Sequence, residues 1–469
     1  ISKISCKLSA GIIQGTLYYI KTICYPALAR LAHLLLYKDK TQGDKVIMEI
    51  QLQYGKETIG IQIPDSVEVT VLEPTRMSPV DSVGLSLKNA LEQAVASEPA
   101  ILPANKEGQT VAIAVPDDSL SLPLAEILPI LLDWLHAQIP DLNSNRINFI
   151  VGCGLHAVYG HEVIDHLVPA NLPEGYRITV HDAFESPTVK VGITSKGTPL
   201  LINKTFVEAD YKIVVGQIDP HQIVGFTDGV SGLVTGCSGE ATLEHNHSLM
   251  FDPAARVGIL ENNPVREDLN EAARLVGIDL AIDFVMTPEK EIVKVVAGPP
   301  VETLLEGAKT SAALYGVGID KKFDIIIASC GGFPKDISIC QAQKGLHLAS
   351  QALNDGGHIL LLAALTRGVG CDIYFDYVSQ FTTPEEVISD FRKQAFKIGA
   401  HKAYLLGRTL NKFDVAIHSE MDQGILQKCH LRAANPSNII EEWLGDAPHE
   451  KSVGIITSAN TTYFVEKEK

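Results

Sequence analysis

Two histidines follow short apolar runs, where an imidazole could take and return a proton near neutral pH. His156 lies five residues after the run Ile147–Val151, within the sequence GCGLH. His221 follows the run Tyr211–Val215, and Pro220 restricts the backbone just before it. Two such rings at one edge of a sheet could face a substrate carbon from opposite sides. A hydrogen-bonded loop histidine is the structural alternative for each.

A third candidate lies in the run from Glu244 to His247, after the stretch Gly225–Gly239, which holds five glycines. Imidazole is a common ligand of transition metals. If the run is helical, His245 and His247 lie on different faces, so at most one points into a given site. Surface polarity is the alternative. The glycines could let backbone N–H groups approach a phosphate, or could form an ordinary flexible loop.

Polar residues in the second half of the chain could bind a carboxylate. Gln341 and Lys344 are three positions apart and share a face if the segment is helical. A lysine beside an amide at a domain edge is suited to a carboxylate. The alternative is the solvated start of a helix.

The elements that carry these residues predict a parallel sheet. Val111–Val115 and Ile147–Val151 are continuous apolar runs, typical of strands buried on both faces. Between them, Pro123–Ile139 has leucines at helical spacing. Strand, helix and strand in this order form a βαβ unit. Ligands of such sheets bind beyond the carboxyl ends of the strands, where Asp117, His156 and His221 fall.

A second α/β series begins near residues 298–320. It reads as a helix over 301–315, a strand at Phe323–Ala328, a helix over Gln343–Asn354 closed by Gly356–Gly357, and a strand at His358–Ala364. We therefore predict an α/β protein with mostly parallel sheets and two domains, 48–305 and 306–469. The active site is expected in the cleft between them.

The first 47 residues have a different composition from the rest, with seven Lys and Arg against two Asp and Glu. We expect them to be an extension outside both domains, either translated upstream sequence or an artefact, with Met48 as a natural start. A membrane span needs about 20 unbroken apolar residues. Lys21, Pro26 and Arg30 interrupt this one.

The overall composition excludes several kinds of binding partner and structural site. The net charge of −17 argues against nucleic acid, since phosphate binding needs a basic surface. The eight cysteines form no CxxC pair and fit neither a zinc ribbon nor a disulfide framework. Reduced thiols in a cytoplasm are the expectation. Oligomeric state stays open.

Four segments, in this order and spacing, resemble the lactate racemase family. They are GCGLH at 152–156, IDPHQIVGF at 218–226, TLEHNHS at 242–248 and SCGGFPKDISICQAQKG at 329–345. The resemblance runs from about Met48 to the C-terminus. It implies a racemase or epimerase of a small 2-hydroxy acid that uses a nickel-pincer nucleotide derived from nicotinate.

The resemblance also implies roles for single residues. His156 and His221 would be the acid/base pair, and His247 would ligate nickel. The residues expected to line the cofactor and substrate are Asp117, Asp118, Ser119, Leu120, Gln341 and Lys344. One neutral histidine would take the hydroxyl proton while the cofactor accepts the hydride from Cα. The resulting 2-keto acid could then receive the hydride on its other face.

Three positions depart from the family pattern. Ser231 stands where the family has the lysine that is joined to the cofactor, so we expect a noncovalently bound cofactor beside Ser231. Leu120 replaces an arginine that would bind the substrate carboxylate, and Cys340 replaces a tyrosine. We therefore expect a 2-hydroxy acid other than lactate.

Two other functions compete with the racemase. A degenerate homologue could bind a nucleotide or carboxylate without turnover, which Ser231 and Leu120 favour and the three histidines oppose. An NAD-type dehydrogenase is supported only by the βαβ units, because no GxGxxG with a following ribose-binding acid is present.

Overall fold

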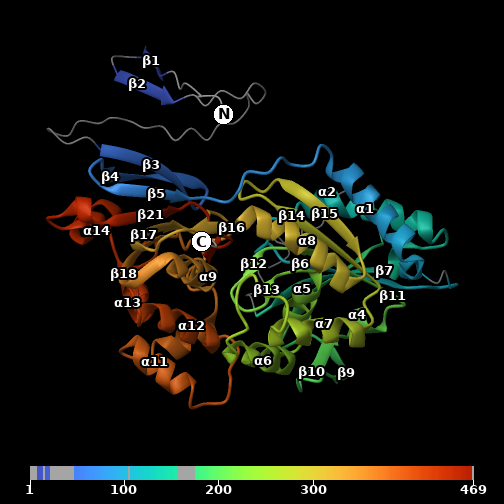
Figure 1. Cartoon of the computed structure of the whole chain (residues 1–469). Helices are drawn as coiled ribbons and strands as arrows, with labels where there is room; N and C mark the ends of the chain where they lie inside the picture. Colours follow the sequence, from blue (N-terminus) through green and yellow to red (C-terminus); the bar gives the residue numbers. More distant parts are fainter. Residues whose placement is uncertain (1–7, 14–15, 22–46, 104–105, 156–174, 467–469) are drawn as a thin grey trace.

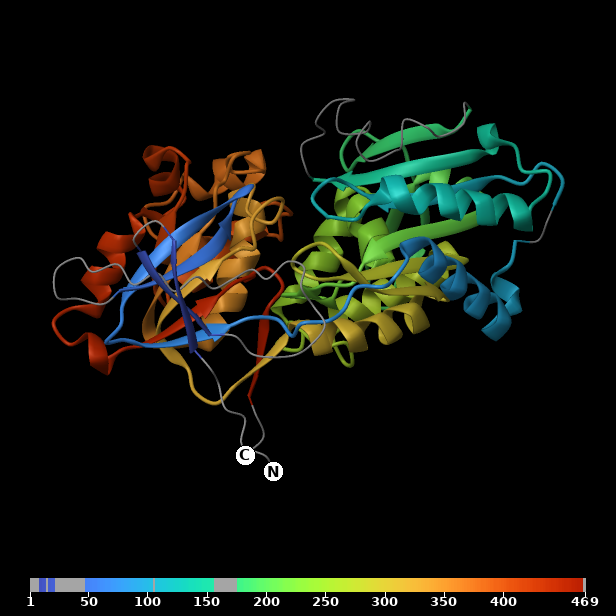
Figure 2. The same ribbon diagram turned by 90° about the horizontal axis from the view of Figure 1, so that it is seen from above.

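The chain folds into two α/β halves that lie side by side (Figure 1 and Figure 2). The computed structural model describes residues 8–13, 16–21, 47–103, 106–155 and 175–466. Each half is built on a six-stranded sheet. The predicted α/β class with mostly parallel sheets is confirmed.

The sheet of the first half is parallel except at one edge. Its order is β15 (Ile292–Gly298), β14 (Leu280–Met286), β11 (Tyr211–Gln217), β6 (Val111–Pro116), β7 (Ile147–Gly154) and β8 (Arg177–Asp182). Only β15 pairs antiparallel, with β14. The chain moves outward from β6 in one direction through β7 and β8. It then continues on the other side through β11 and β14, so the topology switches between β6 and β11.

Helices bury both faces of this sheet because its strands alternate apolar side chains toward each. On one face α1 (Val83–Ser97) and α2 (Leu124–Gln138) form a core with β6 and β7. The other face packs against α4 (Lys204–Glu208), α5 (Gly229–Gly236) and α7 (Pro264–Val276). Beyond them lie α6 (Glu240–Ser248) and the 3-10 turn η3 (Leu249–Phe251). Helix α8 (Pro300–Tyr315) packs on β14 and β15 and leads into the second half.

The sheet of the second half is parallel throughout. Its order is β20 (Arg432–Ala433), β19 (Asp414–His418), β18 (Leu353–Leu362), β17 (Phe323–Ser329), β21 (Ser452–Ile456) and β5 (Glu68–Leu72). One face packs against α9 (Ile339–Ala349), α10 (Asp372–Val378), α11 (Pro384–Phe391), α12 (Ala400–Leu410) and α13 (Gln423–Lys428). The hairpin β3 (Ile47–Tyr54) and β4 (Glu57–Pro64) covers the other face with α14 (Pro436–Leu444).

Small strand pairs complete the described chain. They are β1 (Leu8–Ile13) with β2 (Thr16–Lys21), β9 (Thr188–Ile193) with β10 (Pro199–Asn203), β12 (Pro220–His221) with β13 (Gly225–Phe226), and β16 (Gly316–Ile319) with β22 (Tyr463–Glu466). In the part of the chain that the structure describes, no helix is long and apolar enough to cross a membrane.

Two details differ from the sequence-based expectations. The predicted helix over 343–354 instead spans Ile339–Ala349, and Gly356–Gly357 lie inside strand β18 rather than closing it. Ser338 begins the helix early by accepting a hydrogen bond from the Gln341 N–H. Strand β5 pairs with β21, so it shares a sheet with the second half although it precedes the first (Figure 2).

Candidate active site

The topology switch of the first sheet brings two predicted site segments together. The loop Asp117–Leu120 follows β6, and His221 follows the neighbouring β11. Asp117 is buried, and its Oδ1 accepts hydrogen bonds from the N–H and hydroxyl of Ser119. A ligand in a parallel sheet binds at this switch because the two loops diverge there and leave a crevice.

His221 is held at the edge of this crevice by its own backbone. The N–H groups of Ile223 and Val224 donate to its Nδ1 at 3.3 and 3.4 Å. The proton of the neutral ring is therefore on Nε2. Burial, followed by the charge of Lys344, lowers the pKa of His221 well below its ordinary value. The ring is neutral at neutral pH.

His247 has the surroundings of a metal ligand. It lies on α6, and its Nδ1–H donates to the carbonyl of Leu243 at 3.1 Å, which leaves the lone pair on Nε2. A bond of this kind fixes the tautomer of many metal-binding histidines. Burial, followed by the charge of Lys402, lowers its pKa to about 4, so the ring stays unprotonated at neutral pH.

The neighbouring His245 points elsewhere, as the helical spacing predicts. Its Nδ1 lies 2.9 Å from the hydroxyl of Thr198. His247 instead meets His401 of helix α12, with ring centroids 5.2 Å apart and planes at 65°. In the described ranges, no three His, Cys, Asp or Glu side chains are arranged to hold a metal ion. Among the described residues, His247 would therefore be a single ligand and not part of a three-residue metal site.

Helix α9 of the second half reaches the same crevice. The amides of Gln222 and Gln343 exchange hydrogen bonds of 3.4 and 3.2 Å, which join the residue after His221 to the residue before Lys344. Burial lowers the pKa of Lys344 to about 8, against the opposing charge of Asp219. Gln341 lies one turn earlier on α9, and its side chain forms no hydrogen bond with the described crevice residues.

An ion pair also joins the two halves at the loop after β6. Both Nη atoms of Arg367 donate to the carboxylate of Asp118, at 2.7 and 3.3 Å. The backbone of Arg367 is fixed by a bond from its N–H to the carbonyl of Ile337, at 2.7 Å. A guanidinium from the second half thus lies against the loop that contains Leu120.

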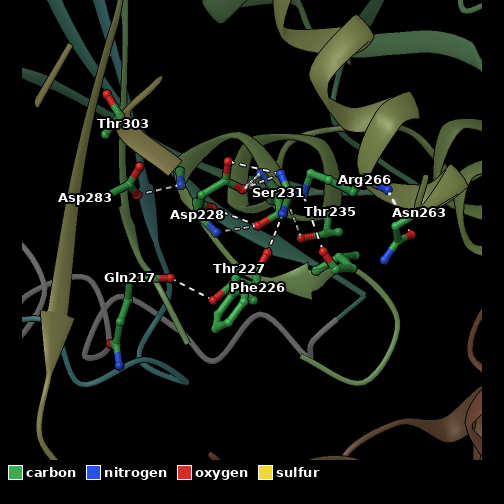
Figure 3. A network of polar contacts seen from close by, with 12 residues as sticks. Gln217, Phe226, Thr227, Asp228, Ser231, Thr235, Asn263, Arg266, Asp283 and Thr303 are labelled. Atoms are coloured by element: carbon green, nitrogen blue, oxygen red, sulfur yellow. Dashed lines mark hydrogen bonds and ion pairs between the residues drawn. The ribbon is translucent and has the colours of Figure 1, made fainter. Parts of the chain in front are cut away.

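Ser231 is engaged in the start of helix α5. Asp228 caps this helix by accepting from the Ser231 N–H, and the Ser231 hydroxyl both accepts from the Asp228 N–H and donates to its carbonyl (Figure 3). Asp228 and Ser231 therefore bind each other at the start of the helix. Whether Ser231 also lines a cofactor stays a prediction.

A buried arginine completes this network. Arg266 is fully buried and forms an ion pair with Asp228 at 3.1 Å, while its other N–H groups donate to the carbonyls of Val224 and Phe226 (Figure 3). The Gly229 N–H donates to Asp283 at 2.7 Å. Because these bonds hold the segment 224–229, they also hold the loop that carries His221.

The glycines of this stretch have a packing role. A Cβ on Gly229 would lie 2.9 Å from the Val214 side chain of β11, and one on Gly236 would lie 2.8 Å from Gly152 of β7. Helix α5 therefore approaches the sheet closely, and its N-terminus is already occupied by Asp228. Close packing therefore accounts for Gly229 and Gly236, whereas a Cβ on Gly232 would meet nothing within 4 Å.

Unpartnered polar atoms line the crevice beside His221. Within the described ranges, Gln217 Oε1 and Asp219 Oδ1 are buried without a hydrogen-bond partner. A small pocket between the halves is lined by Gln217, Ser121, Lys290 and Lys335 among others. Two buried acceptors without donors suit a ligand that carries hydroxyl groups. The hydroxyls of a nucleotide ribose fit this description.

Two thiols, on α9 and just before α10, form a hydrogen-bonded pair. Cys340, on α9, donates a hydrogen bond to Cys371, which lowers the pKa of Cys371 to about 6. Burial and this bond raise the pKa of Cys340. All six cysteines in the described ranges are free thiols.

The structure places most predicted site residues at one crevice, but His156 lies outside the described residues. Sequence reasoning missed His401, Lys402 and Arg367, since each lies on an element that no motif marks. A signal was present for Arg367, because a short loop with two glycines, RGVG, follows the apolar strand 358–364.

Comparisons with known proteins agree with this architecture. Residues 54–258 match the lactate racemase N-terminal domain, and residues 319–454 match the lactate racemase C-terminal domain. The chain belongs to the lactate racemase family. Its expected racemase-like function follows from this membership.

Individual members of the lactate racemase family are distant relatives. The lactate racemase of Thermoanaerobacterium thermosaccharolyticum is 28% identical over 350 residues, covering 72% of this chain and 80% of that protein. The lactate racemase of Lactiplantibacillus plantarum is 29% identical over 352 residues, covering 73% of this chain and 81% of that protein.

Solved structures share the fold. The lactate racemase apoprotein of T. thermosaccharolyticum superposes with a TM-score of 0.80 at 24% identity, covering 89% of this chain and all of that one. A protein of Thermotoga maritima superposes with a TM-score of 0.63 at 16% identity, over 83% of this chain.

Proposed function

We propose that this protein racemises or epimerises a 2-hydroxy acid other than lactate, with a noncovalently bound nickel-pincer nucleotide. The observation that carries the proposal is the convergence of His221, His247 and Lys344 from two halves of the chain on the switch point of the first sheet. When bound, the nucleotide would supply the acceptor for the Cα hydride.

The residues present fit such a cofactor. His247 offers an unprotonated Nε2 to a metal, and the loop Asp117–Leu120 lies at the switch point where a nucleotide would bind. Gln217 Oε1 and Asp219 Oδ1 would accept from its hydroxyl groups. The cofactor would be held without a covalent bond, since Ser231 cannot form the amide that a lysine forms.

The acid/base work would fall to His156 and His221. His221 carries its proton on Nε2, so it would donate a hydrogen bond to the substrate oxygen, as neutral imidazoles do in other enzymes. His156 would then take the hydroxyl proton. Lys344 would bind the carboxylate and hold the reacting carbon between the two rings.

The test is to load the purified protein with nickel-pincer nucleotide and incubate it with single enantiomers of lactate, malate and larger 2-hydroxy acids. Chiral chromatography should show inversion of at least one acid. H221A should slow that inversion about 10²–10⁴-fold, the usual contribution of one acid or base. No inversion of any acid, with the nucleotide shown to be bound, would contradict the proposal and favour a degenerate binding protein.

The noncovalent attachment has a separate test. Intact-mass spectrometry of the loaded, denatured protein should give the mass of the polypeptide alone. A stable adduct would overturn this part of the proposal and leave the racemase activity open.

A further inference from the structure

Cys371 is the one thiol in the described ranges that is not buried. It lies just before α10 and is partly exposed, whereas the other five described cysteines are buried. The loop that leads to it from β18 contains Gly368 and Gly370, both with positive φ. A small oxidant can therefore reach the Cys371 sulfur while the protein stays folded.

Cys340 of helix α9 lies directly beside this loop. Its N–H donates to the carbonyl of Val369 at 3.1 Å. A Cβ placed on Gly370 would lie 3.5 Å from the Cys340 Cβ. Residue 371 comes next in the chain, and the Cys340 thiol donates a hydrogen bond to the Cys371 sulfur. The two sulfur atoms are therefore neighbours, although their residues are far apart in the sequence.

The hydrogen bond prepares the two thiols for different roles. It lowers the pKa of Cys371 to about 6, and the charge of Lys402 acts in the same direction, so Cys371 is a thiolate at neutral pH. The same bond, followed by burial, raises the pKa of Cys340, which stays a thiol. An accessible thiolate in contact with a second cysteine is the arrangement typical of redox-sensing thiols.

We propose that Cys371 is a site of reversible oxidation by hydroperoxides, and that Cys340 resolves the oxidised form as a disulfide. The Cys371 sulfur attacks one peroxide oxygen, the O–O bond breaks, hydroxide leaves, and Cys371 becomes a sulfenic acid. The Cys340 sulfur then attacks the Cys371 sulfur, the S–O bond breaks, and water leaves as the S–S bond forms. In sum, two thiols and one hydrogen peroxide give one disulfide and two water molecules.

The pair lies on elements that also carry crevice residues. Cys340 is next to Gln341 on α9 and one turn before Lys344. The loop before Cys371 carries Arg367, which pairs with Asp118 of the first half. A disulfide would tie this loop covalently to α9. The inference does not depend on the proposed function, since neither sulfur takes part in the racemisation.

The test is peptide mapping after peroxide treatment. The wild type is exposed to hydrogen peroxide at pH 7, its remaining thiols are blocked with iodoacetamide in urea, and it is digested with trypsin without reduction. Cleavage after lysine and arginine separates Cys340, Cys371 and Cys429 into peptides 336–344, 368–392 and 429–432. A disulfide between peptides 336–344 and 368–392 should be the main product, and dithiothreitol should release both.

Two variants separate the steps of the oxidation. C340S keeps a hydrogen-bond donor beside Cys371 but removes the resolving sulfur, so dimedone should trap the sulfenic acid on Cys371. The wild type should take up much less dimedone, because Cys340 consumes the sulfenic acid. C429A removes a third thiol close to the pair and should form the same disulfide as the wild type.

Three results would overturn the inference. One is a wild type without the Cys340–Cys371 disulfide under conditions that oxidise added glutathione. Another is a disulfide from Cys371 to Cys429 in its place. The third is a C340S protein that dimedone does not label at Cys371 after peroxide treatment.

Discussion

Lys344 illustrates how burial prepares a single residue for its ligand. Its pKa of about 8 lies close to working pH, because burial disfavours the charge more than Asp219 restores it. The ammonium is present below pH 8 and is lost above it. A carboxylate held by Lys344 is therefore bound less tightly in alkaline solution.

The KM for the 2-hydroxy acid should rise about tenfold between pH 7 and pH 9. A pH series of initial rates on the loaded enzyme measures this. K344R keeps its charge over the whole range and serves as the control, so its KM should stay nearly constant. A wild-type KM that does not change with pH would show that Lys344 does not bind the carboxylate.

Cys371 should be the most reactive of the six described thiols. The hydrogen bond from Cys340 lowers its pKa to about 6, so it is a thiolate at pH 7, whereas burial raises the pKa values of Cys153, Cys237 and Cys429. Limited iodoacetamide treatment at pH 7 followed by peptide mass spectrometry should label Cys371 first. C340A should slow the labelling, since it removes the hydrogen-bond donor; equal labelling of all six would contradict the assignment.

At the scale of elements, helix α5 and its capping network hold the His221 loop. Removing one partner of a buried ion pair leaves an uncompensated charge, which costs about 3–5 kcal/mol. R266M should lower the free energy of unfolding by this amount in urea titrations followed by circular dichroism. R274M changes an exposed arginine of the same helix and should have almost no effect. Similar losses in both variants would refute this role of Arg266.

The sequence predicted helices and strands well where apolar residues recur at a regular spacing. It predicted poorly the features that depend on contacts between segments far apart in the chain. The strands around Val111 and Ile147 stood out because they are buried on both faces. The glycines of 225–239 were open to interpretation as a phosphate loop. Close packing of α5 on β11 requires the same residue type, so composition could not distinguish the two. His401 carried no signal, because its importance comes from its contact with His247 of α6, which lies far away in the chain.

At the scale of the whole molecule, the Asp118–Arg367 ion pair joins the two halves at the crevice. It is partly exposed, so its contribution to stability is small, about 0.2–1 kcal/mol. For two halves that open and close relative to each other, a shift of this size changes the ratio of open to closed molecules a few-fold. The pair is therefore expected to influence closure more than folding.

R367M should increase the average radius of gyration measured by small-angle X-ray scattering, while the unfolding midpoint changes little. The matched control is R432M, which breaks a similar two-bond pair with Glu442 inside the second half. R432M should leave the radius unchanged. An equal response of both variants, or none from R367M, would rule out a role in closure.

The pairing of β5 with β21 has a consequence for the order in which the protein can form. Residues 68–72 are synthesised well before their partner, residues 452–456, because several hundred residues separate them in the chain. The first sheet uses only residues 111–298 and can assemble while synthesis continues. Strand β5 must stay unpaired until then, and such long-range pairing is slow. The second half is therefore expected to be the late-folding part of the chain and the part in greatest need of a chaperone during synthesis.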